Sequence, residues 1–185
     1  MKLGLVVNPI AGMGGSVALK GSDDRELVDR ARKRGAVPVA PGRAVEALRA
    51  LAAASGRVEL LTYPGDMGET EARLAGLQPE VIGSIGAATS AADTRAAAVA
   101  MADRGVELLL FAGGDGTAVD VLEAIGSRVP ALGIPAGVKM HSAVFAVTPR
   151  SAGELGLRLV RGGLRDVVEA EVMDCLLYTS DAADE

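Results

Sequence analysis

The chain has 185 residues and a formal net charge of −5 at pH 7, and 49% of its residues are hydrophobic while only 2% are aromatic. This length suffices for one well-packed domain, or for one domain and the start of another. The acidic balance argues against proteins that bind nucleic acids or anionic membranes, and the single cysteine, Cys175, excludes a disulfide framework and a cysteine-based zinc site.

Strands and helices alternate in the first half of the chain. The apolar run at residues 3–7 predicts a buried strand, which ends at Asn8-Pro9 and a glycine-rich loop. This run is too short for a signal peptide, and no apolar segment approaches the length of a membrane span, so we expect a soluble cytoplasmic protein. The further elements predicted in this half are a charged helix over residues 23–34, a helix over 43–53, a strand over 58–62, a short helix around 67–77 and a strand over 81–85.

The second half continues this alternation around one unbroken apolar strand. Its predicted elements are a helix over residues 90–103, a strand over 107–112, a helix with the apolar stripe Ala118, Val121, Leu122 and Ile125, a strand over 131–134 and a helix from about 152 to 161. Ser90 and Asp93 match the capping box that opens the first of these helices. The pattern as a whole predicts an α/β domain over residues 1–163, with a mostly parallel sheet flanked by helices.

The C-terminal residues follow a different pattern. Val168, Ala170 and Val172 alternate with glutamates, which is typical of a half-exposed strand. We therefore expect residues 164–174 to be the first strand of a truncated, β-rich second domain. Residues 175–185 continue neither pattern and resemble translated adapter sequence, so we interpret them as a non-native tail.

One glycine turn places a carboxylate between a buried strand and a helix. Gly113-Gly114-Asp115-Gly116-Thr117 follows the strand over residues 107–112 and precedes the stripe of the next helix. Glycines allow backbone N–H groups to approach an anion, and a helix N-terminus adds partial positive charge. A tight turn with a capping threonine explains the glycines and Thr117 but not the carboxylate, so we predict that Asp115 is functional.

Two further loops follow strands of the same predicted sheet. The first, Asn8 to Gly15, lacks the Rossmann fingerprint because Val17 stands where the third glycine belongs, and the chain contains no P-loop. Taken alone, this loop is equally compatible with a flexible turn. Since ligands bind at the carboxyl ends of parallel strands, its placement beside residues 113–117 indicates a shared site.

The third loop, residues 135–142, contains Lys139, His141 and Ser142. Lys139 could meet a phosphate, and Ser142 or His141 could form a hydrogen bond with a ligand, although His141 alone is better explained as a structural residue. Capping accounts for the polar residues that open the helix after residue 90, which leaves only Arg95 with a possible role in anion binding.

The pairing of an early Asn-Pro-x-x-Gly loop with Gly-Gly-Asp-Gly-Thr resembles the ATP-NAD kinase family, and also the wider group of diacylglycerol and sphingosine kinases and phosphofructokinases. Residues 133–143, Gly-Ile-Pro-Ala-Gly-Val-Lys-Met-His-Ser-Ala, are similar to the long-chain bacterial and archaeal branch of ATP-NAD kinases. The resemblance covers about residues 1–174.

The resemblance implies transfer of the ATP γ-phosphoryl group to the 2′-hydroxyl of the adenosine ribose of NAD, with Mg²⁺ as cofactor. Asp115 would take the proton from the hydroxyl. The residues implied for nucleotide and phosphate binding are Asn8, Gly12, Gly113, Gly114, Gly116, Thr117, Gly137 and Lys139. No residue is assigned as a metal ligand. The implied partners are small nucleotides, with homo-oligomers formed by the full-length protein.

Two alternatives stay open at this point: a lipid-type kinase domain and a nucleotide-binding fragment without activity. Lipid kinases of the group typically show Pro-x-Gly-Thr-x-Asn-Asp, whereas residues 135–140 here lack the Asn-Asp pair. Family members also use an Asn-Glu or Asn-Asp motif in the second domain to hold NAD. We therefore expect the present chain to fold but to have essentially no NAD kinase activity by itself.

Overall fold

The computed structural model describes residues 1–13, 33, 35–137, 140–163 and 166–173. The elements in chain order are β1 (Lys2–Val7), α3 (Ala40–Leu51), η1 (Ala52–Arg57), β2 (Glu59–Thr62), η2 (Gly65–Met67), α4 (Glu69–Leu74), β3 (Glu80–Val81), α5 (Ala91–Asp103), β4 (Leu108–Gly113), α6 (Asp115–Ile125), β5 (Ala131–Pro135) and α7 (Pro149–Val160). Within these residues, no helix is long and apolar enough to cross a membrane.

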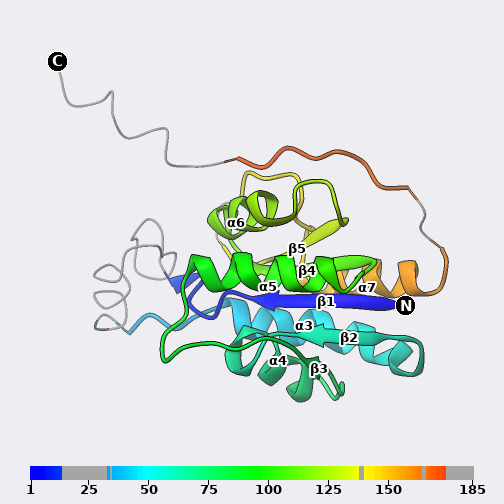
Figure 1. Cartoon of the computed structure of the whole chain (residues 1–185), viewed down its shortest axis with the longest axis horizontal. Coiled ribbons are helices and arrows are strands. Elements are labelled where there is room, and N and C mark those ends of the chain that lie inside the picture. Colours follow the sequence, from blue (N-terminus) through cyan, green and yellow to red (C-terminus); the bar gives the residue numbers. More distant parts are fainter. Residues whose placement is uncertain (14–32, 34, 138–139, 164–165, 174–185) are drawn as a thin grey trace.

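Five parallel strands form one sheet in the order β3-β2-β1-β4-β5 (Figure 1). The chain builds outward from β1 to β3 and then returns to the other side of β1 through α5 and β4. In the register of the sheet, Val7 lies beside Ala112, and Gly113 lies beside Pro135. The strands β1, β4 and β5 therefore end at the same level, on both sides of the point where the strand order reverses.

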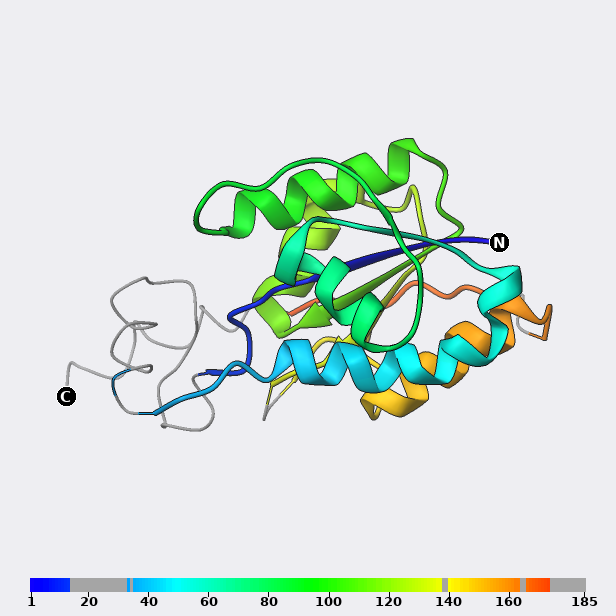
Figure 2. The same ribbon diagram turned by 90° about the horizontal axis from the view of Figure 1, so that it is seen from below.

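Helices cover both faces of the sheet, because side chains alternate between the faces along each strand. Leu3, Leu5 and Val7 of β1 point into a core shared with α3, α4 and α7. Val6 and Phe111 point to the opposite core, which is shared with α5 and α6. Figure 2 shows the resulting layers, with α5 (green) on one side of the sheet and α3 (light blue) and α7 (orange) on the other. This arrangement confirms the predicted α/β fold.

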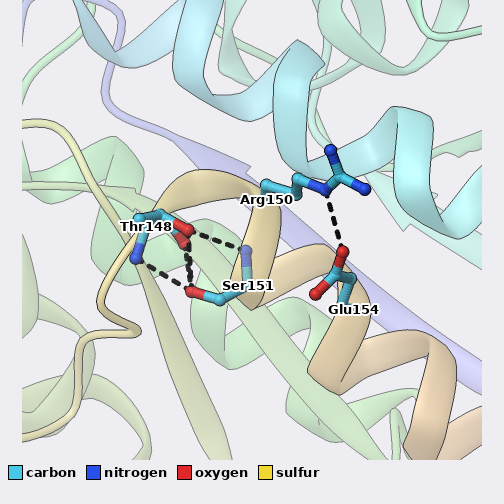
Figure 3. A network of polar contacts seen from close by, with 4 residues as sticks. All are labelled: Thr148, Arg150, Ser151 and Glu154. Carbon is cyan, nitrogen blue, oxygen red and sulfur yellow. Dashed lines mark hydrogen bonds and ion pairs between the residues drawn. The ribbon is translucent and has the colours of Figure 1, made fainter.

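The start of α7 shows how a local sequence signal defines a helix end (Figure 3). The Thr148 hydroxyl accepts a hydrogen bond from the backbone N–H of Ser151 at 3.0 Å, and the Ser151 hydroxyl oxygen accepts one from the N–H of Thr148 at 2.8 Å. Pro149 occupies the first turn, where its missing N–H costs nothing. Arg150, in the same first turn, pairs with Glu154 one turn further along the helix at 2.8 Å.

Several predicted element boundaries are wrong. Helix α3 begins at Ala40 and ends at Leu51, whereas residues 43–53 were predicted, because Pro41 fits in a first turn. The strand predicted over 81–85 is only Glu80–Val81, since Gly83 has a φ of 73° and turns the chain away from β2. Apart from Lys33, the predicted helix over residues 23–34 lies outside the described residues.

The strand predicted over residues 164–174 does not form in the described part, residues 166–173. This segment runs along the side of the sheet where β5 lies (Figure 1). The N–H of Ala143 donates to the carbonyl of Glu171 at 2.9 Å, and Val172 packs against the α5–α6 core. The segment is therefore attached to the α/β domain by a few contacts and not by a ladder of strand pairs. The division into a domain over 1–163 and a second domain remains a prediction, and the tail over 175–185 lies outside the described residues.

Candidate active site

Three loops meet at the carboxyl ends of β1, β4 and β5. The N–H of Asn8 donates to the carbonyl of Ala112 at 3.0 Å, and the N–H of Ala136 donates to the carbonyl of Gly113 at 3.1 Å. These bonds continue the sheet ladder by one step beyond the strands. The loops after Val7, Gly113 and Pro135 therefore lie side by side, as the sequence predicted, at the position where open α/β sheets bind ligands.

The glycine turn between β4 and α6 contains two glycines with different tasks. A Cβ atom on Gly113 would lie 2.3 Å from the Thr117 hydroxyl oxygen, so this glycine makes room for the first turn of α6. Gly114, the N-cap of α6, has a φ of −110°, and nothing lies within 4 Å of the position of its missing Cβ. Neither backbone conformation nor packing requires glycine at position 114. Its lack of a side chain leaves open space beside the N-terminus of α6.

The first loop is joined to α6 by Asn8 and Thr117. The side-chain NH₂ group of Asn8 donates to the Thr117 hydroxyl oxygen at 3.0 Å, and the Asn8 side-chain oxygen Oδ1 accepts a hydrogen bond from the N–H of Ile10 at 3.2 Å. Thr117 is only 3% exposed. Both residues were predicted to line the nucleotide site, and the structure shows them bound to each other as the tie between the two loops.

Gly12 joins the first loop to the third. Its φ is 84°, and a Cβ atom there would lie 2.5 Å from the carbonyl oxygen of Ala136. A side chain at position 12 would thus meet both backbone strain and a clash with backbone. Of the residues predicted in the third loop, Gly137 is exposed, and its N–H approaches the Met140 sulfur at 3.3 Å, while Lys139 lies outside the described residues.

The third loop also holds the Asp115 carboxylate. The N–H of Ser142 and the Ser142 hydroxyl donate to Asp115 Oδ1 at 2.9 and 2.6 Å, and the N–H of His141 donates to Oδ2 at 3.0 Å. Asp115 is 9% exposed and is the first residue of α6. A carboxylate at a helix N-terminus also interacts favourably with the helix dipole.

These hydrogen bonds control the charge of Asp115. Burial by itself would raise the pKa of the Asp115 carboxyl, but the hydrogen bonds from the Ser142 hydroxyl and from the backbone of His141 and Ser142 outweigh it. The nearby charge of His141 acts in the same direction, and the net result is a pKa below the ordinary value of 3.8. Asp115 is therefore ionised at every pH near neutrality.

An aromatic anchor keeps the third loop in place. Phe145 packs edge to face on Phe111 of β4, with ring centroids 5.3 Å apart. The N–H of Gly133 donates to the carbonyl of Val144, and the carbonyl of Gly133 accepts the N–H of Ala146, both at 3.0 Å. Residues 144–146 are thus tied to β5, and only a few residues separate this anchor from the two N–H groups that bind Asp115.

The sequence predicted that the third loop belongs to the site, but not that this loop forms hydrogen bonds with Asp115. Ser142 and His141 were considered as ligand contacts, whereas the structure shows their backbone and the Ser142 hydroxyl directed at Asp115. The predicted capping box of α5 is confirmed. Arg95 forms ion pairs with Asp120 and Glu123 of α6, which accounts for its charge without a bound anion.

The described residues contain no group of three or more His, Cys, Asp or Glu side chains that could hold a metal ion. In proteins, Mg²⁺ is commonly held by substrate phosphates and water with few protein ligands.

A comparison with protein-family models matches residues 3–164 to the ATP-NAD kinase N-terminal domain. No curated protein and no solved structure matches the chain. The matched region includes all five strands of the sheet, except for Lys2 at the start of β1, and all three loops of the candidate site.

Proposed function

Because the chain belongs to the ATP-NAD kinase N-terminal domain family, we propose that it forms the catalytic domain of a kinase that transfers the γ-phosphoryl group of ATP to the 2′-hydroxyl of the adenosine ribose of NAD. Family membership supports a phosphotransferase of the NAD kinase type. The observation that best supports the specific reaction is the Asp115 carboxylate, held ionised at the N-terminus of α6 beside the open space over Gly114.

Asp115 is suited to receive the proton of an attacking hydroxyl. The 2′-hydroxyl oxygen forms a bond to the γ-phosphorus, the bond from that phosphorus to the oxygen of ADP breaks, and the hydroxyl proton passes to the carboxylate. Phosphoryl transfer has a loose transition state and depends mainly on alignment and charge. A carboxylate of low pKa is adequate for this task because it stays ionised and orients the hydroxyl from the start.

The start of α6 is suited to bind phosphate oxygens. The first N–H groups of a helix lack partners within the helix and point toward an anion placed at its end. Gly114 leaves space at this end, and Gly116 in the first turn is exposed. Mg²⁺ bound to ATP would neutralise the phosphate charge near Asp115. Gly137 and Lys139 are assigned to the wall of this site from the sequence alone.

Two further proposals concern the wider context of the chain. We propose that its ligands are small nucleotides in the cytoplasm and that the full-length protein forms homo-oligomers. We also propose that a β-rich second domain positions NAD, since alignment of the reacting groups can supply roughly 7–11 kcal/mol of barrier reduction. On this basis the 185-residue chain should bind ATP but form essentially no NADP.

The decisive test measures transfer of label from [γ-³²P]ATP to NAD, NADH, diacylglycerol and sphingosine. It is run on the 185-residue chain and on a protein that carries this domain together with a β-rich second domain. We expect label on NAD in the two-domain protein. Label on a lipid would favour the lipid-type kinase, and ATP binding without any transfer would favour a non-catalytic nucleotide-binding domain. NADP formation by the short chain would contradict the need for a second domain.

In the active protein, Asp115→Asn should reduce turnover by roughly 10²–10⁴-fold, because an amide cannot accept the hydroxyl proton. Asp103→Asn is the matched control, since Asp103 is an exposed carboxylate paired with Arg128 at the far end of α5. Unchanged turnover in a folded Asp115→Asn protein would show that Asp115 has only a structural role.

A further inference from the structure

The Ser142 hydroxyl takes part in two hydrogen bonds of opposite sense. It donates to Asp115 Oδ1 at 2.6 Å, and its oxygen accepts the backbone N–H of Met173 at 3.0 Å. A hydroxyl has one proton and can rotate to offer it to any acceptor nearby. An N–H group can only donate, so the contact with Met173 leaves Asp115 as the direction for the Ser142 proton.

The segment that carries Met173 is attached at two more points beside this site. The N–H of Ala143, the residue after Ser142, donates to the carbonyl of Glu171 at 2.9 Å. Val172, between the two hydrogen-bonded residues, is half-buried and packs against the α5–α6 core. Residues 171–173 thus contact the third loop at Ser142 and Ala143, next to the hydrogen bond between Ser142 and Asp115.

We propose that Ser142 is a positioning residue for Asp115 and that residues 171–173 hold the Ser142 hydroxyl in its donating orientation. Residues 171–173, which lie outside the sheet, would in this way influence the orientation and charge of the Asp115 carboxylate through the Ser142 hydroxyl. We call this chain of hydrogen bonds the relay. Ser142 is 6% exposed, and water has little access to replace its hydroxyl. The inference deepens the proposed kinase function, and its kinetic test rests on that function, but its structural test does not.

Several groups act on the Asp115 carboxylate, and the test must distinguish the Ser142 hydroxyl from the others. The third loop contributes the Ser142 hydroxyl, the two backbone N–H groups and the charge of His141. The N-terminus of α6 contributes its dipole. Only the hydroxyl is removed by Ser142→Ala, since the backbone N–H groups of residues 141 and 142 remain in place.

The structural test is a carbon-13 NMR titration of the Asp115 carboxyl in the 185-residue chain, with the resonance assigned by its loss in Asp115→Asn. In Ser142→Ala the midpoint should move to higher pH, and in Ser142→Thr, which keeps a hydroxyl, it should return toward the wild-type value. Ser90→Ala is the matched control, because the Ser90 hydroxyl donates to the Asp93 carboxylate at 2.8 Å on the exposed start of α5. It should leave Asp115 unchanged.

The role of the segment is tested by Met173→Pro, which removes the N–H donor to Ser142. The Asp115 midpoint should shift in the same direction as in Ser142→Ala, by a smaller amount. Val168→Pro, at an exposed position of the same segment, is the control and should have no effect. An unshifted midpoint in Met173→Pro would overturn the relay through residues 171–173.

In the active kinase, Ser142→Ala should lower kcat roughly 10- to 100-fold, the range expected for loss of a hydrogen bond to a charged group. The KM for ATP should stay the same, and the acid limb of the pH profile should move toward neutrality. A merely structural role would lower the active fraction equally at all pH values.

A folded Ser142→Ala protein with a wild-type Asp115 midpoint, or equal shifts in the alanine and threonine variants, would refute the proposal. A shifted midpoint in the 185-residue chain, together with a two-domain protein that phosphorylates none of the acceptors, would instead support the positioning role and refute the proposed function.

Discussion

Glu71 offers a quantitative test of the structure away from the active site. This residue lies in α4 and is 2% exposed, and its Oε2 atom has no hydrogen-bond partner among the described residues. Burial, together with the charge of Asp66, raises the pKa of the Glu71 carboxyl from 4.5 to about 7, against the opposing effect of the backbone N–H groups of Gly68 and Glu71. The folded chain therefore holds a proton on Glu71 that the unfolded chain has already lost.

The sign of the resulting pH dependence follows from this difference. Between pH 4.5 and 7 the folded state binds more protons at Glu71 than the unfolded state, so the free energy of unfolding falls as the pH rises through this window. By pH 8 the raised pKa of Glu71 lowers the free energy of unfolding by about 3 kcal/mol relative to its value at low pH. Most of this decrease occurs above pH 5.

Glu71→Gln keeps the size of the side chain and removes the charge. We expect this variant to be more stable than wild type by about 3 kcal/mol at pH 8 and by less than about 1 kcal/mol at pH 5. Urea unfolding followed by circular dichroism at pH 5, 6, 7 and 8 measures the difference. With a urea dependence of about 1–3 kcal/mol per molar, the gap between the two midpoints should widen by about 1 M or more across this range.

The matched control is Glu46→Gln in α3, where the carboxylate is exposed and pairs with Arg43 at 3.6 Å. Its effect on stability should stay within about 0.5 kcal/mol at each pH. A constant gap between wild type and Glu71→Gln from pH 5 to pH 8 would refute the reasoning, because it would mean that Glu71 carries the same charge in the folded and unfolded chains.

Two further predictions concern glycines. Gly114→Val should weaken ATP binding, measured by calorimetry, without unfolding the chain, because its side chain would enter the open space beside α6. The control Gly42→Val, also at a position with nothing within 4 Å of the missing Cβ, should bind normally, and equal affinities would argue against a phosphate site at Gly114. Gly153→Ala should destabilise the chain by about 1–3 kcal/mol in thermal or urea unfolding, since its Cβ would lie 2.0 Å from the carbonyl oxygen of Ala47 and force α7 away from α3. Unchanged stability would contradict this close helix packing.

The sequence allowed the fold class to be predicted because the signals are local. The apolar run over residues 108–112 is buried at every position, as expected of a central parallel strand. The apolar stripe of α6 through Ala118, Val121 and Ile125 packs into the core that α6 shares with α5, and the capping box at Ser90 begins α5. Leu122, which was placed on the same stripe, is exposed. Errors arose where the signal was short or two-sided, as in the strand over 81–85 and the alternating residues 168–172.

For the candidate site, the sequence predicted the functional carboxylate but not the contacts between the loops. Asp115 stood out because a turn between a strand and a helix does not need a carboxylate. The pairing of Asn8 with Thr117 joins residues 109 positions apart, and the bond between Ser142 and Asp115 joins residues 27 positions apart. No spacing rule relates such positions, because the distance between two loops depends on strand order and register.

The sequence by itself thus determined most of the segments that become strands and helices, and that a carboxylate follows the central strand, since side-chain periodicity and turn chemistry act over only a few residues. The tertiary structure alone decided that the Asn8 amide reaches Thr117, that the third loop turns its N–H groups toward Asp115, and that residues 171–173 reach Ser142. The physical reason is that a hydrogen bond forms only within about 3 Å, and only the packed sheet brings these distant groups to that separation.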